Sequence, residues 1–159
     1  GTGTLTVGDD PRILPLGKYL RNWKINELPQ LLNIFSGQMS VVGPRPQSVR
    51  NFNAFLNHVQ DSISKERPGL TGIGSLFFRN EEGMLAASRD PDQLYDNIIM
   101  PYKGELELWY SDNQSIFLYF KLIWLTAYMV VFSKNLDLFS SIPNLPKPKS
   151  ELLDLLDNL

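Results

Sequence analysis

Apolar side chains recur every three or four positions along much of this chain, as they do in amphipathic helices. The clearest case lies between residues 27 and 35, where the apolar positions are Leu28, Leu31, Leu32 and Phe35. Asn26 precedes this stretch and suits an N-cap, because its side-chain oxygen can accept from the free amides of the first turn. Pro29 falls in that turn, where a missing N–H costs little, and Gly37 ends the pattern.

The remaining segments predict more helices than strands. Helical patterns cover residues 12–21, 49–65, 81–88 and 101–110. Strand or extended segments are expected at 39–42, which runs into a Gly-Pro-Arg-Pro turn, and at 72–78. We therefore expect an α/β fold that is mostly helical with few short strands.

Residues 116–132 form the most hydrophobic run, rich in aromatic side chains and interrupted only by Lys121. The run suits a buried core helix. It equally suits a helix that lies in the membrane interface, with the Lys121 ammonium reaching the headgroups. A transmembrane span is the least favoured interpretation, because the run is at the lower edge of spanning length.

Composition narrows the possible chemistry. The chain has 159 residues, of which 43% are apolar, and this suits one domain with a real core. A formal net charge of -2 provides no basic field, so nucleic acid is not expected as a partner. The chain has no cysteine and one histidine, which excludes thiolate chemistry and His-rich metal sites. Any metal would bind oxygen ligands, as magnesium does.

Several short motifs follow one another in a fixed order. They are Asp10–Ile13, Gly17–Arg21, Asn26–Leu31, Met39–Pro46 and Arg67–Gly72, and a later stretch runs from Leu108 through Ser115 into the apolar run. Together they resemble the bacterial sugar transferases, the monotopic polyprenyl-phosphate phosphoglycosyl transferases. The resemblance covers roughly residues 6–134, and the order of five motifs makes it far more specific than any one of them.

The resemblance implies a transferase that moves a sugar 1-phosphate from a UDP-sugar to undecaprenyl phosphate and releases UMP. This step starts the assembly of exopolysaccharide, capsule, O-antigen of lipopolysaccharide, or other glycans. The resemblance also implies a magnesium ion, a membrane-associated protein at the cytoplasmic face of the inner membrane, and an essential Asp-Glu pair at the start of the Leu-Pro-Gln helix.

Simple physical chemistry supports several of the implied site residues. A carboxylate at a helix N-terminus stays ionised in the dipole field, which suits Glu27 as a catalytic group and magnesium ligand. The guanidinium groups of Arg21 and Arg45 suit the neutralisation of a diphosphate. Pro44 and Pro46 flank Arg45 and restrict its backbone, so its side chain is expected to be aimed in advance.

One position departs from the family pattern. Asn26 stands where the family has its aspartate, which is thought to attack the donor and form a covalent phospho-sugar intermediate. An amide caps a helix as well as a carboxylate does, but it cannot be an anionic nucleophile. Another carboxylate then attacks, or the lipid phosphate displaces UMP directly, or the protein is inactive.

The other expected substrate-binding residues come from two further motifs. The loop before residue 73 contributes Thr71 and Gly72, and the acidic cluster after the 72–78 segment contributes Arg79, Glu81 and Glu82. With Glu27, the two glutamates of that cluster are the candidate replacement nucleophiles. We favour an active variant, and the alternative is a non-catalytic module at the membrane surface that has kept the fold.

The chain divides into two parts by composition. Residues 1–135 are expected to form the catalytic domain, and residues 136–159 a linker and a short acidic amphipathic tail, because Pro143, Pro146 and Pro148 stiffen the connection. The first residues include no initiator methionine or signal peptide. We expect a fragment that lacks the membrane-inserting helix and the basic strand segment that precede these motifs in the family.

Overall fold

The computed structural model describes residues 29–132 and 136–157, the last four of these by their backbone alone. This part of the chain is a helical domain with one two-stranded sheet, which confirms the mostly helical α/β prediction. In chain order the elements are α2 (Gln30–Phe35), β1 (Ser40–Val42), α3 (Val49–Asn53), α4 (Asn57–Ile63), β2 (Gly69–Thr71), α5 (Ile73–Phe77), α6 (Glu81–Ala87), α7 (Pro91–Leu94), the π-helix η2 (Tyr95–Ile99), α8 (Met100–Asp112), α9 (Ile116–Phe132), α10 (Leu138–Ser141) and α11 (Ser150–Asp157).

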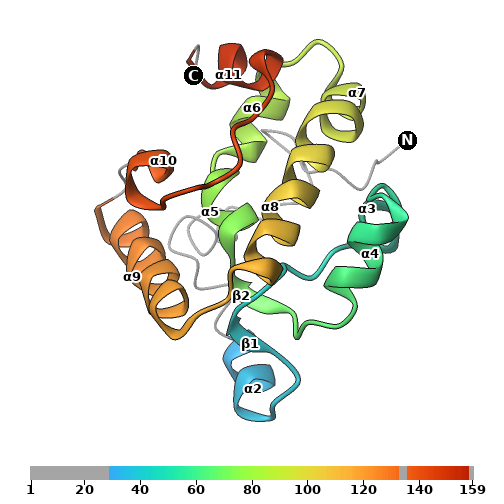
Figure 1. The fold of residues 1–159 in the computed structure, drawn as a ribbon. Coiled ribbons are helices and arrows are strands. Elements are labelled where there is room, and N and C mark those ends of the chain that lie inside the picture. The colour runs from blue at the N-terminus through green and yellow to red at the C-terminus, as the bar shows by residue number, and fades with distance from the viewer. Residues whose placement is uncertain (1–28, 133–135, 158–159) are drawn as a thin grey trace.

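Helix α8 occupies the middle of the domain. Figure 1 shows it between the α3–α4 pair and the α5–α6 pair, and it packs against both α4 and α5. Met100 and Leu106 of α8 are completely buried. Gly104 faces α4, where a Cβ atom would lie 3.4 Å from the side chains of Phe55 and Val59, so the two helices approach closely.

The sheet is small and parallel. Strands β1 and β2 pair with Ser40 opposite Gly69 and Val42 opposite Thr71. Parallel strands end at the same edge of a sheet. The segments that leave β1 and β2, which start at Gly43 and Gly72, therefore lie side by side.

Helix α9 covers the sheet with one face and exposes the other. Leu118, Leu122, Leu125 and Met129 are buried against the core. The apolar side chains on its outer side are Ile116, Phe117, Phe120, Trp124, Val131 and Phe132, each at least 57% exposed. Within the described residues, no helix combines the length and apolar character that a membrane crossing needs.

The segment after residue 135 packs on the same core as the rest of the domain. Leu138, Ile142, Leu145 and Leu152 are buried there. The Tyr102 hydroxyl of α8 also donates to the Pro146 carbonyl at 2.6 Å. Figure 1 shows this segment running from α10 to α11, and α11 packs against η2. The three prolines thus lie in a packed segment.

Two predicted elements differ in the structure. The helix expected over 49–65 is divided into α3 and α4, because Phe55 between them turns inward and is 5% exposed. The extended segment expected over 72–78 is instead helix α5, and the strand precedes it at Gly69–Thr71. Short apolar runs do not separate helix from strand by periodicity, and here one helical turn buries both Ile73 and Leu76.

The start of α2 also differs from the prediction. Its first helical residue is Gln30, and Pro29 precedes it rather than lying within the first turn. The proposed cap, Asn26, lies outside the described residues. The predicted stop holds, because Gly37 adopts a positive φ of 77°, which a glycine accepts without strain.

Candidate functional site

The Gly-Pro-Arg-Pro turn and the Pro-Gly-Leu-Thr-Gly loop form one backbone unit, which we name the glycine lock (residues 43–46 and 68–72). The Gly43 amide donates to the Thr71 carbonyl at 2.9 Å, and the Gly69 amide donates to the Pro44 carbonyl at 2.8 Å. Two motifs that are separated by more than twenty residues therefore hold each other by main-chain bonds.

Three glycines make this close approach possible. A Cβ atom at Gly69 would lie 2.2 Å from the Gly43 nitrogen, and one at Gly72 would lie 2.3 Å from the Gly43 oxygen. A Cβ atom at Gly43 itself would lie 2.5 Å from the Arg67 oxygen. All of these neighbours are backbone atoms, which cannot move aside as a flexible side chain can. The glycines in both motifs are thus required by packing.

Side chains join the glycine lock to α9. The Thr71 hydroxyl lies 2.8 Å from the Thr126 hydroxyl, and Thr126 donates to the Leu122 carbonyl at 2.7 Å. Because the Thr126 hydrogen is used in that bond, Thr71 is the donor between the two threonines. Ser40 of β1 lies 3.4 Å from the Tyr119 hydroxyl of the same helix. The predicted substrate-binding residue Thr71 is 5% exposed and acts in this contact.

The proline-flanked arginine lies at the surface of the glycine lock. Pro44 is buried, whereas Arg45 and Pro46 are exposed. Arg45 therefore extends from a backbone that the glycine lock fixes. Its role in anion binding stays a prediction.

The structure separates the two glutamates of the Arg79–Glu82 cluster. Glu81 is the first residue of α6, and its carboxylate points inward to the Nζ of Lys103 on α8. The neighbouring Glu82 is exposed, and Arg79 is half-buried. The cluster is thus one inward-facing carboxylate with two charged side chains beside it.

A buried carboxylate lies on α8, one turn after Lys103. Glu107 is 7% exposed, and burial is the main reason that its pKa rises from 4.5 to about 7, against the lowering effects of Lys103 and the Gly74 amide. One of its oxygens, Oε2, has no hydrogen-bond partner in the described part of the chain. Neither Lys103 nor Glu107 was among the site residues predicted from the sequence. Their spacing of four within the predicted helix at 101–110 was the available signal.

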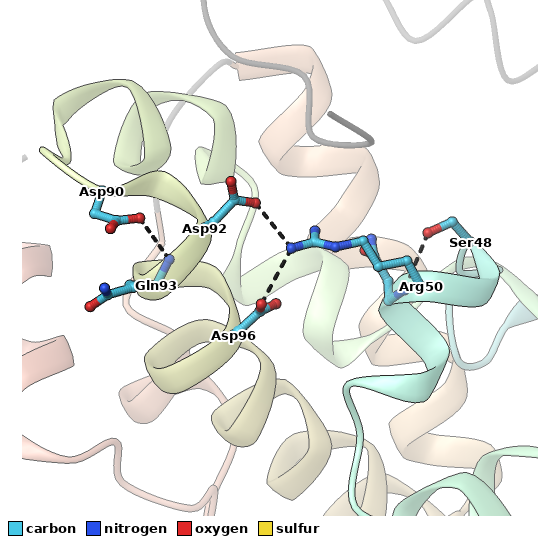
Figure 2. A network of polar contacts seen from close by, with 7 residues as sticks. Ser48, Arg50, Asp90, Asp92, Gln93 and Asp96 are labelled. Carbon is cyan, nitrogen blue, oxygen red and sulfur yellow. Dashed lines mark hydrogen bonds and ion pairs between the residues drawn. The ribbon is translucent and has the colours of Figure 1, made fainter. Parts of the chain in front are cut away.

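A network of surface charges ties α3 to α7 and η2. Figure 2 shows the Arg50 guanidinium between two carboxylates, 3.0 Å from Asp92 and 3.3 Å from Asp96. On the same elements, Ser48 caps α3 through the Asn51 amide and Asp90 caps α7 through the Gln93 amide. Arg50 lies a few residues after the Gly43–Pro46 turn, so the network fixes the segment through which the chain leaves that turn.

Three predicted site residues, Arg21, Asn26 and Glu27, lie outside the described residues. The predicted magnesium ligand is Glu27, so that prediction also concerns residues outside the described part of the chain. Within residues 29–132 and 136–157, no group of three or more acidic or histidine side chains is arranged to hold a metal ion. Of the predicted site, the described residues therefore include the glycine lock with Arg45 and the Arg79–Glu82 cluster.

Comparison with known proteins relates this chain to one family of transferases. Residues 1–133 match the family model described as bacterial sugar transferase. The chain is 33% identical over 128 residues to the sugar transferase EpsL of Bacillus subtilis, covering 80% of this chain and 55% of that protein. It is 33% identical over 130 residues to a UDP-glucose:undecaprenyl-phosphate glucose-1-phosphate transferase of Klebsiella pneumoniae, covering 80% and 25%.

A third relative is the undecaprenyl-phosphate glucose phosphotransferase of Komagataeibacter xylinus, 34% identical over 135 residues and covering 82% of this chain and 23% of that protein. The chain thus spans about half the length of one of these relatives and about a quarter of the other two.

Proposed function

Because the chain belongs to the bacterial sugar transferase family, we propose that it transfers a sugar 1-phosphate from a UDP-sugar to undecaprenyl phosphate and releases UMP. The observation that carries the proposal is the glycine lock, in which two motifs of the family form one rigid backbone unit that presents Arg45. Relatives named as undecaprenyl-phosphate transferases support the acceptor, and a relative named as an exopolysaccharide production protein supports the role in exopolysaccharide synthesis.

The proposed reaction is a displacement at the β-phosphorus of the donor. An oxygen of the lipid phosphate bonds to that phosphorus, the bond to the bridging oxygen breaks, and UMP leaves with the electron pair. In the two-step version, a carboxylate attacks first and the lipid phosphate then attacks the covalent intermediate. Direct displacement needs no protein nucleophile, and this suits a chain with Asn26 at the aspartate position.

The arginines supply charge neutralisation in this proposal. The bridging oxygen gains negative charge as the bond to the β-phosphorus breaks, and a fixed guanidinium stabilises that charge without reorganisation. Arg45 on the glycine lock is suited to this role, and Arg21 is proposed as its partner. Glu27 is proposed as a catalytic group and as the ligand of a magnesium ion, which would add further positive charge at the diphosphate.

The outer face of α9 supports placement at a membrane surface, which we propose to be the cytoplasmic leaflet. Exposed apolar side chains follow one side of this helix, where the Trp124 ring stacks on the Tyr128 ring and the Phe132 ring packs against Tyr128 at a tilt. The Lys121 ammonium lies 5.5 Å from the Phe117 ring, at the border of this face. Amphipathic aromatic rings and a flexible cation favour the headgroup region. The inner face of α9 holds the glycine lock, so the same helix would set the height of Arg45 above the lipid.

The direct test is UMP release by the protein in nanodiscs that contain undecaprenyl phosphate, with a panel of UDP-sugars. We expect release that requires the lipid acceptor, stops with EDTA and returns with magnesium. Glu27→Ala should abolish it. Glu27→Ala with full activity would remove Glu27 from the mechanism, and no release from any UDP-sugar would contradict the proposal.

Asn26 favours a second candidate, a non-catalytic module at the membrane surface. The variant Asn26→Asp separates the two. If only this variant releases UMP, the native chain has lost the reaction and kept the fold. If the native chain is active and Asn26→Asp adds little, direct transfer or another nucleophile replaces the family's aspartate.

A further inference from the structure

Lys103 lies inside the protein although it is a cation. Its side chain is 12% exposed, and its Nζ contacts the carboxylate of Glu81, which is itself 24% exposed. An ammonium that is taken out of water is costly unless it is paired, so this contact is a requirement of the folded structure. The two residues are 22 positions apart in the sequence and come from α8 and α6.

Within the part of the chain that the structure describes, Glu81 is the carboxylate that forms an ion pair with Lys103. The Lys103 Nζ also lies 5.3 Å from the centre of the Phe78 ring and 5.4 Å from that of the Tyr95 ring, so two aromatic faces lie near the ammonium. Glu107 is the second carboxylate near Lys103, and its raised pKa, about 7, shows that burial opposes its charge. Glu81 is therefore the carboxylate that contacts the Lys103 ammonium directly.

Glu81 belongs to a turn whose other anchors also point inward. Phe78 before it and Met84 after it are 4% and 2% exposed. The Asn80 side chain covers Gly83, where a Cβ atom would lie 2.5 Å from its Oδ1. With Phe78, Glu81 and Met84 all fixed, the backbone that carries the two intervening charged residues, half-buried Arg79 and exposed Glu82, is held in place.

We propose that Lys103 is a positioning residue which, through Glu81, sets the direction in which Arg79 meets the nucleotide diphosphate donor. Glu81 is then an anchor that does not touch the substrate. This inference rests on the proposed function, because it assumes a UDP-sugar as the donor. A guanidinium recognises phosphate by two parallel hydrogen bonds and is therefore sensitive to direction, so a loosened turn weakens donor binding more than it slows the chemical step.

The experiment compares Lys103→Met, Glu81→Gln and Lys103→Arg with a matched control, Lys147→Met, at an exposed lysine outside the α6 turn. Affinity for UDP-glucose is measured by calorimetry, kcat and KM by UMP release, and the melting temperature by circular dichroism. We expect Lys103→Met and Glu81→Gln each to raise Kd and KM about tenfold with kcat within about threefold. Lys103→Arg should recover most of the affinity, and Lys147→Met should change nothing.

The outcomes separate this inference from the proposed function. If the two variants melt earlier but keep their Kd and KM, the pair is only structural and the inference is overturned. If the native protein binds UDP-glucose but releases no UMP from any UDP-sugar, the proposed function fails, and the Kd values still decide the role of Lys103. If the native protein binds no UDP-sugar, both fail. Should Lys103→Met not fold, Glu81→Gln, which keeps the size and an acceptor oxygen, provides the same comparison.

Discussion

Two turns carry candidate site residues, and different forces hold them. The turn at residues 43–46 is fixed by main-chain hydrogen bonds to residues 68–72, with glycines where no Cβ atom fits. The turn at 78–83 is fixed by side chains, above all by the ion pair between Glu81 and Lys103. The first should keep its shape whatever the charge state of the protein, whereas the second depends on a buried charge and on its partner.

This difference also decides how each turn responds to substitution. Backbone packing fails when a side chain is added, and the cost does not depend on pH. An ion pair fails when one partner is removed, since the remaining charge is then buried alone. The predictions below test the two kinds of turn separately, together with the groups that attach them to the rest of the domain.

The largest effect is expected for Gly69→Ala. The added methyl group would overlap the Gly43 backbone, so we expect a loss of more than about 3 kcal/mol in the free energy of unfolding. Urea denaturation measures it. The control is Gly37→Ala, which meets no atom within 4 Å and loses only about 1 kcal/mol through its positive φ of 77°. Equal costs at the two glycines would refute the close backbone contact.

The next effect is a pH dependence of the free energy of unfolding, caused by Glu107. Its pKa is 4.5 in the unfolded chain and about 7 in the folded one, so the unfolded state loses the proton first as the pH rises. Stability from this group is complete below about pH 4.5, declines up to about pH 7 and is absent above it. The variant Glu107→Gln carries no charge at any pH. We therefore expect it to be more stable than the native protein by up to about 3 kcal/mol at pH 8.

Urea denaturation of both proteins at pH 5 and pH 8 tests this prediction, because the difference between them removes the contribution of all other titrating groups. At pH 5 the two should differ by less than about 1 kcal/mol. A constant difference across the range would mean that Glu107 keeps an ordinary pKa in the folded state.

A smaller effect is expected where the glycine lock meets α9. Thr126→Val leaves the Thr71 hydroxyl as a buried donor without an acceptor, and should cost about 2 kcal/mol. Thr71→Val removes that donor together with its bond, and should cost about 1 kcal/mol. The order of the two urea midpoints is the measurement. If Thr71→Val is the more harmful, the direction of the hydrogen bond is the reverse of that inferred here.

The smallest effect is expected in the network of Figure 2. Asp92→Asn weakens an ion pair whose side chains are 39% and 73% exposed, and Arg50 keeps its contact with Asp96. We expect a change of less than about 0.5 kcal/mol, lost in high salt. A thermal melt at low and high ionic strength measures it, and a large effect that persists in salt would give this network a structural importance equal to that of the buried pair.

The glycine lock could be predicted from the sequence better than the turn at 78–83, for a physical reason. Glycines and prolines at fixed spacings report directly on backbone geometry, so the strand at 40–42 and the Gly43–Pro46 turn agreed with the prediction. The partner of Glu81 could not be found in the same way, because Lys103 comes from a distant helix and only tertiary packing brings the two together.

Burial of particular side chains explains where the structure differs from the elements predicted from the sequence. The break between α3 and α4 is set by the inward turn of Phe55, and the helical state of α5 by the space around Ile73 and Leu76. The 116–132 run was predicted as a helix, but the sequence left open whether that helix is buried in the core, lies in the membrane interface or, least favoured, spans the membrane. The structure places the sheet on one face and leaves an aromatic surface on the other.

The most direct measurement follows the phosphate itself. The protein in nanodiscs with undecaprenyl phosphate is given a UDP-sugar labelled with ³²P in the β-phosphate, and lipid and water-soluble products are separated by butanol extraction. Transfer of a sugar 1-phosphate predicts that the label enters the lipid fraction in step with the release of unlabelled UMP. If the label remains in UDP while sugar reaches the lipid, or if no lipid product forms with any donor, the proposed reaction is contradicted.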